Sequence, residues 1–329
     1  MRMQNKSIMG LLLGEAAGIG PEITVKALQN DEIRNDATWV IIGDERVWKK
    51  AQKTAEVSLS YKIISSPAEA NSNETSVWFI DLQNIDPSSI YPGEISEQSG
   101  RETGKTFKYA VEWANQNELD GIVYAPLNKE ALHKGGFHFQ DEIHFFADLF
   151  NCKHGFGEVN KLDNLWVTRV TSHIPLRKVG ECVTKESVTK AICFAHNIVT
   201  QANIDPKIVV AGLNPHVGDG GLMGREEIDE ILPAIQELRA SGFDVDGPFP
   251  ADTIYLKIEE ENYNSLVSMY HDQAQIGMKL LGFHRGVTIS GGLPVVLTTP
   301  AHGTAFDIVD KGTANSGAMI QAMKTAVQW

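Results

Sequence analysis

The sequence contains little cysteine, which restricts the kinds of scaffold it can encode. Its 329 residues include three cysteines, Cys152, Cys182 and Cys193, and no two of them are close together. An odd number without a close pair argues against a disulfide scaffold and against a cysteine-cluster zinc site. Buried reduced thiols in a cytoplasmic protein are therefore expected.

Long apolar runs and basic residues are also scarce. The sequence has no stretch of about 18 apolar residues, so no membrane-spanning helix is expected. The apolar run at residues 8–13 leads into a glycine-rich loop, which indicates a first strand rather than a signal peptide. With 29 Lys and Arg against 42 Asp and Glu, the net charge is −13, which argues against nucleic acid as a partner.

Short apolar segments alternate with amphipathic ones along the chain. A helix is predicted from Pro21 to Asn30 and a longer one at about residues 101–117. The predicted strands, some with the loop that follows, lie at 8–13, 38–44, 77–81, 121–128, 165–172, 207–214 and 265–272. This alternation predicts an α/β fold with a largely parallel sheet, and the chain length makes two domains the default.

Three of these strands are associated with a histidine at or near their carboxyl ends: His173, His216 in the loop "NPHVGDGG", and His271. Functional loops of parallel sheets lie at the carboxyl ends of the strands, so the three side chains are candidates to converge. Three neutral imidazoles would suit zinc or another divalent transition metal. Because the histidines are far apart in sequence, a second interpretation stays open, in which each is simply hydrogen-bonded in its own loop.

The glycine-rich stretch "GEAAGIGPE" also has two interpretations. Its glycines, at positions 14, 18 and 20, do not fit the G-x-G-x-x-G dinucleotide pattern. The stretch is either a tight strand-to-helix turn that needs positive φ, or an anion site at the start of the helix at Pro21. Glu15 and Glu22 add negative charge, which counts against a phosphate there.

Several motifs recur in a known order along the chain: "GEAAGIGPEI", "GIVYAPLNKEAL", "SHIPLRKV", "AGLNPHVGDGGLMGREEID", "GPFPADT", "MYHDQ", "LGF" and "AHGTAFDIVDKGTANSGAM". Together they resemble the 4-hydroxythreonine-4-phosphate dehydrogenase family of pyridoxine biosynthesis. They span nearly the whole sequence. The "HGTAFDI" segment also resembles the adenine-binding loop of isocitrate and isopropylmalate dehydrogenases.

The resemblance implies a fold and an assembly. The fold would be the two-domain α/β fold of isocitrate and isopropylmalate dehydrogenases, with largely parallel sheets and a cleft between the domains. Residues 1–130 plus 300–329 would form the domain with the cofactor-side loops. Residues 131–299 would form a central domain with the metal ligands and the dimer contacts. The protein would be a homodimer with shared active sites.

The resemblance also implies the cofactors. His173, His216 and His271 would bind one divalent ion, usually zinc, with magnesium, cobalt or manganese as alternatives, and the ligands would come from both subunits. The loop with His302, Gly303, Ala305 and Asp307 would bind NAD on its adenine side. NAD is expected over NADP because Asp307 would disfavour an added phosphate and no basic residue follows before Lys311.

The reaction implied by the resemblance is NAD-dependent oxidation of a secondary alcohol beta to a carboxylate, followed by loss of carbon dioxide. Asp252 and Lys279 match family residues that line the substrate pocket, and they are the candidate catalytic residues. Asp252 would orient or deprotonate a substrate amine or hydroxyl, but a helix N-cap is an alternative role for it. Lys279 has the alternative of being a solvated helix charge.

The sequence departs from the family at the substrate pocket. Glu142 and Ile143 replace the histidine and threonine of a "GHTE" motif, Thr288 replaces an asparagine, and Leu297 replaces an arginine. A carboxylate and apolar side chains would repel a phosphate or leave it unpaired, so Lys279 alone remains of the expected phosphate contacts. Misalignment by one position, with His144 in the histidine's role, is the alternative.

These observations predict a metal- and NAD-dependent dehydrogenase whose substrate is a non-phosphorylated hydroxy acid, such as a sugar acid or a diol carboxylate. One alternative is a true 4-phosphohydroxy-L-threonine dehydrogenase of vitamin B6 biosynthesis. A metal-dependent hydrolase without NAD and a catalytically inactive binding protein are two further alternatives. The expected partners are a small hydroxy acid and a second copy of the chain, without nucleic acid or membrane.

Overall fold

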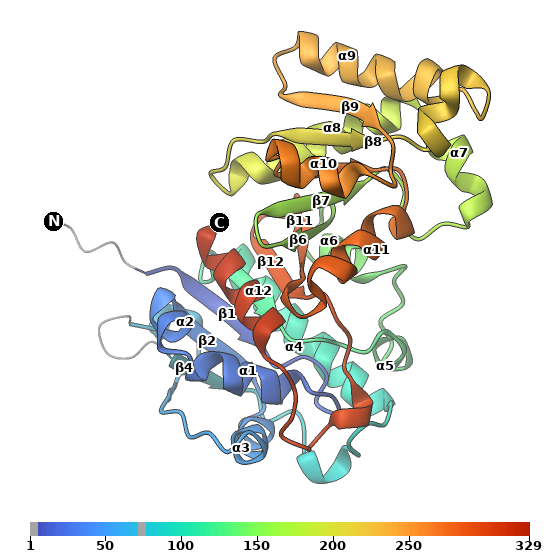
Figure 1. Cartoon of the computed structure of the whole chain (residues 1–329). Helices are drawn as coiled ribbons and strands as arrows, with labels where there is room; N and C mark the ends of the chain where they lie inside the picture. The colour runs from blue at the N-terminus through green and yellow to red at the C-terminus, as the bar shows by residue number, and fades with distance from the viewer. Residues whose placement is uncertain (1–5, 72–76) are drawn as a thin grey trace, which may run out of the picture. The chain divides into compact units, whose positions relative to one another are not determined.

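The computed structural model describes residues 6–71 and 77–329, which form two compact α/β units. The first unit consists of Met1–Phe156 and Val287–Trp329, and the second of Gly157–Gly286 (Figure 1). Both units alternate strands with helices, which confirms the predicted fold class. Within the described residues, no helix is long and apolar enough to cross a membrane.

The first unit has a mainly parallel sheet with the strand order β3-β4-β2-β1-β5-β12-β11, in which only the β11/β12 pair is antiparallel. Its strands are β1 (Ile8–Leu12), β2 (Thr38–Gly43), β3 (Lys62–Ile63), β4 (Val77–Asp81), β5 (Gly121–Tyr124), β11 (Val287–Gly291) and β12 (Val296–Pro300). Its helices are α1 (Gly20–Gln29), α2 (Asp31–Asp36), α3 (Glu45–Thr54), α4 (Glu97–Asn115), α5 (Lys129–Lys134), α6 (Glu142–Leu149) and α12 (Gly317–Gln328).

Helices cover both faces of this sheet. Helices α1, α2 and α12 contact one another on one face, and α4 packs with α5 and α6 on the other (Figure 1). The strands are accordingly apolar along their whole length, as expected for parallel strands that are buried on both sides. The core on the α4 side is rich in aromatic rings, among them Phe107, Tyr124, Phe145 and Phe146.

The chain reverses its direction of winding at β1. From β1 it proceeds to β2 and β4 on one side, and it then returns through α4 to β5 on the other side of β1. In open α/β sheets, ligands bind outside the carboxyl ends of the strands at such a switch point. The carboxyl ends of β1 and β5 are therefore the place in this unit where a ligand site is expected.

The second unit has the strand order β6-β7-β10-β8-β9, with only the β6/β7 pair antiparallel. Its strands are β6 (Gly157–Leu162), β7 (Leu165–Arg169), β8 (Ile208–Ala211), β9 (Val245–Phe249) and β10 (Ser265–Ser268). Its helices are α7 (Val179–Cys182), α8 (Lys185–Gln201), α9 (Leu232–Ala240), α10 (Ile254–Glu261) and α11 (His271–Gly282).

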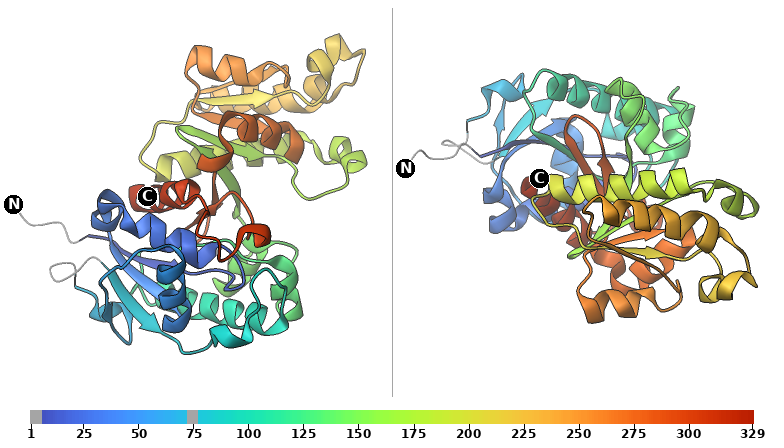
Figure 2. Two further views of the ribbon diagram at one scale, coloured as in Figure 1. Left: turned by 60° about the horizontal axis from the view of Figure 1, so that its bottom comes forward. Right: turned by 90° about the horizontal axis from the view of Figure 1, so that it is seen from above.

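Side chains of the interior strand β8 alternate between two cores, as the two-residue period of a strand requires. Ile208 and Val210 pack in the cluster with residues of α8 and α9, whereas Val209 and Ala211 pack in the cluster with residues of α10 and α11. Figure 2 shows these helices around the sheet of the second unit. Because helices cover both faces of the sheet, the ends of its strands are where polar loops reach the surface.

The boundaries between the units differ from those expected from the sequence. They lie at 156/157 and 286/287 rather than at 130/131 and 299/300. Helix α6 belongs to the first unit because Phe145 and Phe146 pack on Phe107 of α4. Strand β11 belongs there because it pairs with β12. The substrate-pocket candidates Glu142, Ile143, Thr288 and Leu297 consequently all lie in the first unit.

Candidate active site

The three candidate metal ligands all lie in the second unit, beside the carboxyl ends of adjacent parallel strands. His173 follows β7, His216 follows β8, and His271 is the first residue of α11 after β10. The ring centroids of His173 and His271 are 5.8 Å apart. Two imidazoles that share one ion through bonds of about 2.1 Å have centroids roughly 5–6 Å apart, so this pair fits a common ion in both spacing and chemistry.

A carboxylate orients one of these rings. The Nδ1 atom of His271 lies 2.7 Å from Oδ1 of Asp272. A hydrogen bond of this kind fixes the ring orientation of metal-binding histidines and leaves the other nitrogen available as a ligand. The arrangement therefore supports His271 as a ligand through Nε2.

His216 lies apart from this pair in its loop. Within the described residues, no group of three or more His, Cys, Asp or Glu side chains is close enough to hold a metal ion. His173 and His271 thus provide two donors, and the three-histidine site stays a prediction. Its completion requires a donor from outside this chain or a movement of the His216 loop.

The two candidate catalytic residues of this unit are on its surface. Asp252 is exposed in the turn before α10, and Lys279 is exposed in the last turn of α11. The N-cap of α10 is Thr253 rather than Asp252, so the structure does not support the alternative that Asp252 caps this helix. Both roles in the pocket stay predictions.

In the first unit, three loops meet at the switch point. The N–H of Glu15, after β1, donates to Pro126 O after β5 at 3.0 Å, and the N–H of Ile19 donates to Thr304 O after β12 at 3.0 Å. Gly14 has φ +69°, and a Cβ there would lie 2.5 Å from Pro126 O, so this turn requires glycine. The sequence "GEAAGIG" thus brings the β1 loop against the candidate cofactor loop.

The first turn of α1 contains a buried carboxylate of the chain itself. Buried Glu22, in the first turn, accepts a hydrogen bond from Ala314 N–H at 2.9 Å and pairs with Lys26 at 2.7 Å. This favours the tight-turn interpretation of the glycine stretch over an anion site at Pro21.

The candidate cofactor loop at residues 301–307 has an open surface near its centre. Gly303 is exposed, and a Cβ at this position would meet no atom within 4 Å. Ala305 has a left-handed backbone with φ +44°, and Nδ1 of His302 lies 3.0 Å from Gly303 O. Such a loop exposes backbone groups to a ligand, but its contacts with NAD stay a prediction.

Glu15 is a buried carboxylate whose hydrogen bonds could not be predicted from the sequence. Its Oε1 accepts hydrogen bonds from the Ala17 N–H at 3.0 Å and from the Ser99 hydroxyl. Burial raises the pKa of the Glu15 carboxyl, although these two hydrogen bonds oppose the shift. Glu15 therefore ties the β1 loop to the start of α4 at the switch point.

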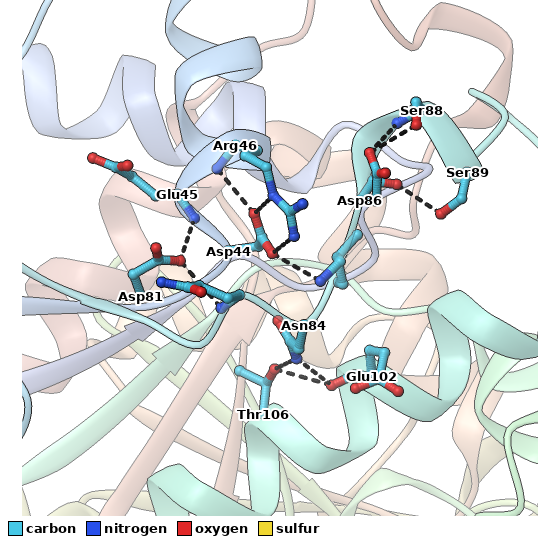
Figure 3. Close-up of polar contacts among 12 residues, drawn as sticks. Asp44, Glu45, Arg46, Asp81, Asn84, Asp86, Ser88, Ser89, Glu102 and Thr106 are labelled. Carbon is cyan, nitrogen blue, oxygen red and sulfur yellow. Dashed lines mark hydrogen bonds and ion pairs between the residues drawn. The ribbon is translucent and has the colours of Figure 1, made fainter.

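A polar network stiffens the neighbouring strand ends, as Figure 3 shows. Buried Asp44, after β2, accepts two hydrogen bonds from the Arg46 guanidinium at 2.9 and 2.8 Å and one from the Ile85 N–H at 2.8 Å. Burial opposes ionisation of Asp44, but these hydrogen bonds outweigh it and hold its pKa below the ordinary value. Asp81, after β4, accepts from the Glu45 N–H at 2.9 Å. The network fixes the loops that border a cavity lined by Leu13, Gly14, Asp44, Ile85 and Thr103, among others.

Glu142 lies beside the end of β5. It is the first residue of α6, and its Oε2 accepts a hydrogen bond from the Tyr124 hydroxyl at 3.1 Å, while its Oε1 is 3.8 Å from Lys129 Nζ. Its side chain is 25% exposed. His144 Nδ1 lies 2.5 Å from Asp141 Oδ1. The structure thus combines an accessible carboxylate with a phenol and an ammonium, neither of which the sequence analysis singled out.

The other three substrate-pocket candidates differ in exposure. Thr288 is half-buried on β11, Ile143 is buried, and Leu297 is fully buried in the core of the first unit. A fully buried leucine is not open to a ligand in this structure. Leu297 therefore disfavours phosphate binding only because it is not an arginine, and not through a contact of its own.

Each unit is an α/β fold with a largely parallel sheet, and its candidate site residues lie in loops at the carboxyl ends of strands, where α/β enzymes bind their ligands. The profile of the family described as "Pyridoxal phosphate biosynthetic protein PdxA" matches residues 35–326. The chain belongs to this family, which confirms the resemblance. It is an oxidoreductase that acts on a hydroxyl group.

Curated relatives and solved structures match nearly the whole chain. A "Putative 4-hydroxythreonine-4-phosphate dehydrogenase 2" of Rhizobium meliloti is 40% identical, over 99% of this chain and 94% of that protein. A "Putative D-threonate 4-phosphate dehydrogenase" of Oceanobacillus iheyensis is 38% identical, over 99% and 98%. The crystal structure of the 4-hydroxythreonine-4-phosphate dehydrogenase of Klebsiella pneumoniae is 34% identical, with a TM-score of 0.86 and 98% of each chain covered.

A more distant solved structure belongs to an enzyme that is named for a different substrate. It is a terephthalate 1,2-cis-dihydrodiol dehydrogenase from Burkholderia xenovorans, 25% identical, with a TM-score of 0.65 and 98% of each chain covered. The fold alone is shared with a β-decarboxylating dehydrogenase of Thermococcus kodakarensis, at 11% identity and a TM-score of 0.50, over 96% of this chain and 81% of that chain. Dehydrogenase relatives suggest a nicotinamide cofactor and a divalent metal.

Proposed function

We propose that this chain is an NAD- and divalent-metal-dependent dehydrogenase of a non-phosphorylated hydroxy acid, with loss of carbon dioxide after oxidation. The single observation that carries the substrate class is Glu142. A carboxylate that is partly open to solvent stands where the family resemblance expects a histidine. A carboxylate accepts hydrogen bonds from hydroxyl or ammonium groups, and it repels a phosphate.

The surroundings of Glu142 agree with this substrate class. Nζ of Lys129 lies 3.8 Å from Glu142 Oε1, and a leucine within the core stands at position 297, where the resemblance expects an arginine. A phosphate is usually held by several charge-assisted hydrogen bonds, often bidentate ones from arginine. The terephthalate dihydrodiol dehydrogenase is named for a diol without phosphate, which is precedent for such a substrate on this fold.

A phosphorylated hydroxy acid is the second candidate. Relatives at 38–40% identity are named for 4-hydroxythreonine 4-phosphate and D-threonate 4-phosphate. Exposed Lys129 of the first unit or exposed Lys279 of the second would be the cation available to such a substrate. Membership of a dehydrogenase family argues against the hydrolase and the inactive binding protein.

In the proposed reaction, the carbinol hydrogen leaves as a hydride and the hydroxyl proton passes to a base, which we assign to Asp252. His173 and His271, together with His216 of a second copy of the chain, would hold the divalent ion, zinc being the first choice. When bound, the ion would polarise the substrate oxygen, and NAD would accept the hydride. Glu142 would accept a hydrogen bond from a second substrate hydroxyl or an amine, and Lys279 would pair with the substrate carboxylate.

The candidate cofactor loop supports NAD rather than NADP. Asp307 is exposed, and the next basic residue, Lys311, donates to the Asp307 carbonyl oxygen at 2.6 Å. An added ribose phosphate would meet the Asp307 carboxylate, whereas a hydroxyl would find an acceptor in it. Thermal stabilisation by NAD at a lower concentration than by NADP is the expected result of a paired titration.

We also propose a homodimer, because one chain is a donor short of a metal site. Helix α11 has an exposed apolar face formed by Ile276, which is 62% exposed, and Leu280, which is 84% exposed, with Leu256 of α10 also exposed. A second copy of the chain is the partner that would both cover this face and supply the missing donor. Leu280→Asp should give a monomer in sedimentation and lower the zinc content; a variant that stays dimeric would show that another face is used.

The experiment that tests the function is a screen of hydroxy acids and diol carboxylates with NAD, read as NADH absorbance together with released carbon dioxide. Turnover of a non-phosphorylated acid with equal amounts of NADH and carbon dioxide is expected. NADH without carbon dioxide would remove the decarboxylation from the proposal. Turnover confined to phosphorylated acids would replace the proposed substrate class by the second candidate.

A further inference from the structure

The loop that carries His216 has an unusual backbone. Six consecutive residues, from His216 to Gly221, have positive φ values of 53°, 59°, 76°, 44°, 67° and 98°. Three of them are not glycine, and Val217 is β-branched. A run of left-handed residues crowds each Cβ against a carbonyl oxygen, so it persists only where the surroundings fix it. Strained segments of this kind concentrate at functional sites.

A buried carboxylate fixes the beginning of this loop. The side chain of Glu227, which is 2% exposed as a residue, accepts hydrogen bonds at Oε1 from the N–H groups of Leu213 and Asn214, both at 2.7 Å. Its Oε2 accepts from Asn214 Nδ2 at 2.9 Å. The same amide also donates to Glu226 Oε2 at 2.7 Å. Both carboxylate oxygens are therefore committed to the two residues that precede Pro215.

The left-handed run itself packs against the same carboxylate. Gly218 is buried, and a Cβ on it would lie 2.9 Å from Glu227 Oε2 and 2.8 Å from Gly224 O. The Met223 N–H closes the turn by donating to Gly218 O at 3.1 Å. Glu227 thus contacts the loop on both sides of His216, which has left-handed φ and ψ of 53° and 30°.

The backbone around Glu227 is itself irregular. Glu227–Ile231 forms a π-helical turn immediately before α9. Such turns are rare and occur frequently at functional sites. Here the turn begins at the residue whose carboxylate holds the loop, so both irregular segments meet at one side chain.

We propose that Glu227 is a positioning residue for the metal site, which holds the left-handed loop so that His216 is presented in one orientation. This inference rests on the proposed function, because it takes His216 as the metal donor that one copy of the chain supplies to His173 and His271 of the other copy. Glu227 need not touch the metal or the substrate; it acts through the backbone of residues 213–218. Without it, the strained run would relax, and His216 would lose its fixed direction.

Three variants of the full chain test the proposal. Glu227→Ala removes the acceptor of every hydrogen bond that the beginning of the loop donates to this carboxylate. Glu227→Gln keeps a carbonyl oxygen that can still accept from the two N–H groups. Asp229→Asn is the matched control, because Asp229 lies on the same turn and pairs with Arg225 on the exposed surface at 2.8 Å. For each protein, Zn²⁺ affinity is measured by chelator competition, and amide hydrogen exchange of residues 212–224 is measured without metal.

Glu227→Ala should weaken zinc binding about 10–100-fold, the range found when a residue that orients a ligand is removed. Exchange in the loop should become faster, with Glu227→Gln less affected in both respects and Asp229→Asn like wild type. Folded Glu227→Ala protein that binds zinc within about twofold of wild type would overturn the proposal. If Glu227→Ala does not fold, Glu227→Gln decides. Its amide NH2 group cannot accept from Asn214 Nδ2, so this variant should still bind zinc more than twofold more weakly than wild type, and an affinity within twofold would overturn the proposal.

The two readouts separate this proposal from the function on which it rests. Absence of zinc binding in wild type and in Asp229→Asn would overturn the metal site, and with it the role of Glu227 in that site. Unchanged hydrogen exchange in Glu227→Ala, together with normal zinc binding by wild type, would overturn the positioning role alone.

Discussion

Replacing Glu142 by glutamine should shift the substrate preference from hydroxy acids without phosphate towards phosphorylated ones, rather than simply lower activity. Glu142→Gln keeps the size of the side chain and its hydrogen bond from Tyr124, which is 3.1 Å long, but removes the charge that Lys129 faces at 3.8 Å. A hydrogen bond to a charged group is worth about 1.5–3 kcal/mol, which corresponds to about 10–100-fold in affinity. The side chain is 25% exposed, so solvent screens this interaction only in part.

Two opposite effects follow from the lost charge. For a substrate whose hydroxyl donates to the carboxylate, kcat/KM should fall about 10–100-fold. For a phosphorylated hydroxy acid, removal of the repulsion should strengthen binding by about tenfold or more, since two unit charges about 4 Å apart repel by about 1 kcal/mol in bulk water and by about 4 kcal/mol at an effective dielectric constant of about 20.

The assay compares each hydroxy acid with its phosphorylated form, on wild type, Glu142→Gln and the control Glu130→Gln. Glu130 is an exposed carboxylate on α5 that pairs with Lys134 at 2.8 Å, so its replacement changes the net charge equally. Substrate turnover gives kcat/KM, and inhibition by the phosphorylated form gives its affinity. If Glu142→Gln changes both quantities no more than Glu130→Gln does, Glu142 does not select the substrate.

Three further predictions concern stability and the loops of the first unit. Leu297→Arg should unfold at a denaturant midpoint far below that of wild type, because it places an unpaired charge at a fully buried position, at a cost of several kcal/mol; a shift as small as that of a surface variant would show that the arginine reaches solvent. Gly14→Ala should lose NAD binding or stability, since its Cβ would collide with the backbone of Ala125 and Pro126, and normal values of both would contradict the turn geometry. Because burial raises the pKa of Glu15 in the folded protein, the stability linked to its protonated form is complete below the ordinary value of 4.5 and is lost as the pH rises through the folded value. Glu15→Gln should therefore be more stable than wild type at neutral pH and should lose this advantage below about pH 4.5 in parallel unfolding curves. A stability difference that does not vary with pH would refute the raised pKa of Glu15.

The strands and their order of appearance could be predicted because their signal is local. Apolar runs such as Ile208–Ala211 are expected for strands that are buried on both faces. The places of His173, His216 and His271 after these strands followed from the same pattern. Their mutual distances did not follow, because a one-dimensional pattern contains no information on how far apart the loops lie.

The errors and omissions have equally specific causes. The unit boundary after residue 130 was misplaced because the packing of Phe145 and Phe146 on Phe107 is a long-range contact. The burial of Leu297 could not be seen from an alignment of motifs, which gives the residue type but not its direction. Glu227 lies in the motif "GREEID", but its role became visible only from the left-handed backbone of residues 216–220.

The most direct test of the proposed function is the ratio of kcat/KM for a hydroxy acid and its 4-phosphate, measured as NADH formation by the wild-type protein with zinc present. D-threonate and 4-hydroxy-L-threonine, each with and without phosphate, are the first pairs to compare, since relatives are named for the phosphorylated forms. If neither pair is turned over, the same comparison applies to the acid found in the screen. We predict a higher kcat/KM for the form without phosphate. Efficient turnover of a phosphorylated form, with kcat/KM above about 10⁴ M⁻¹s⁻¹, would contradict it.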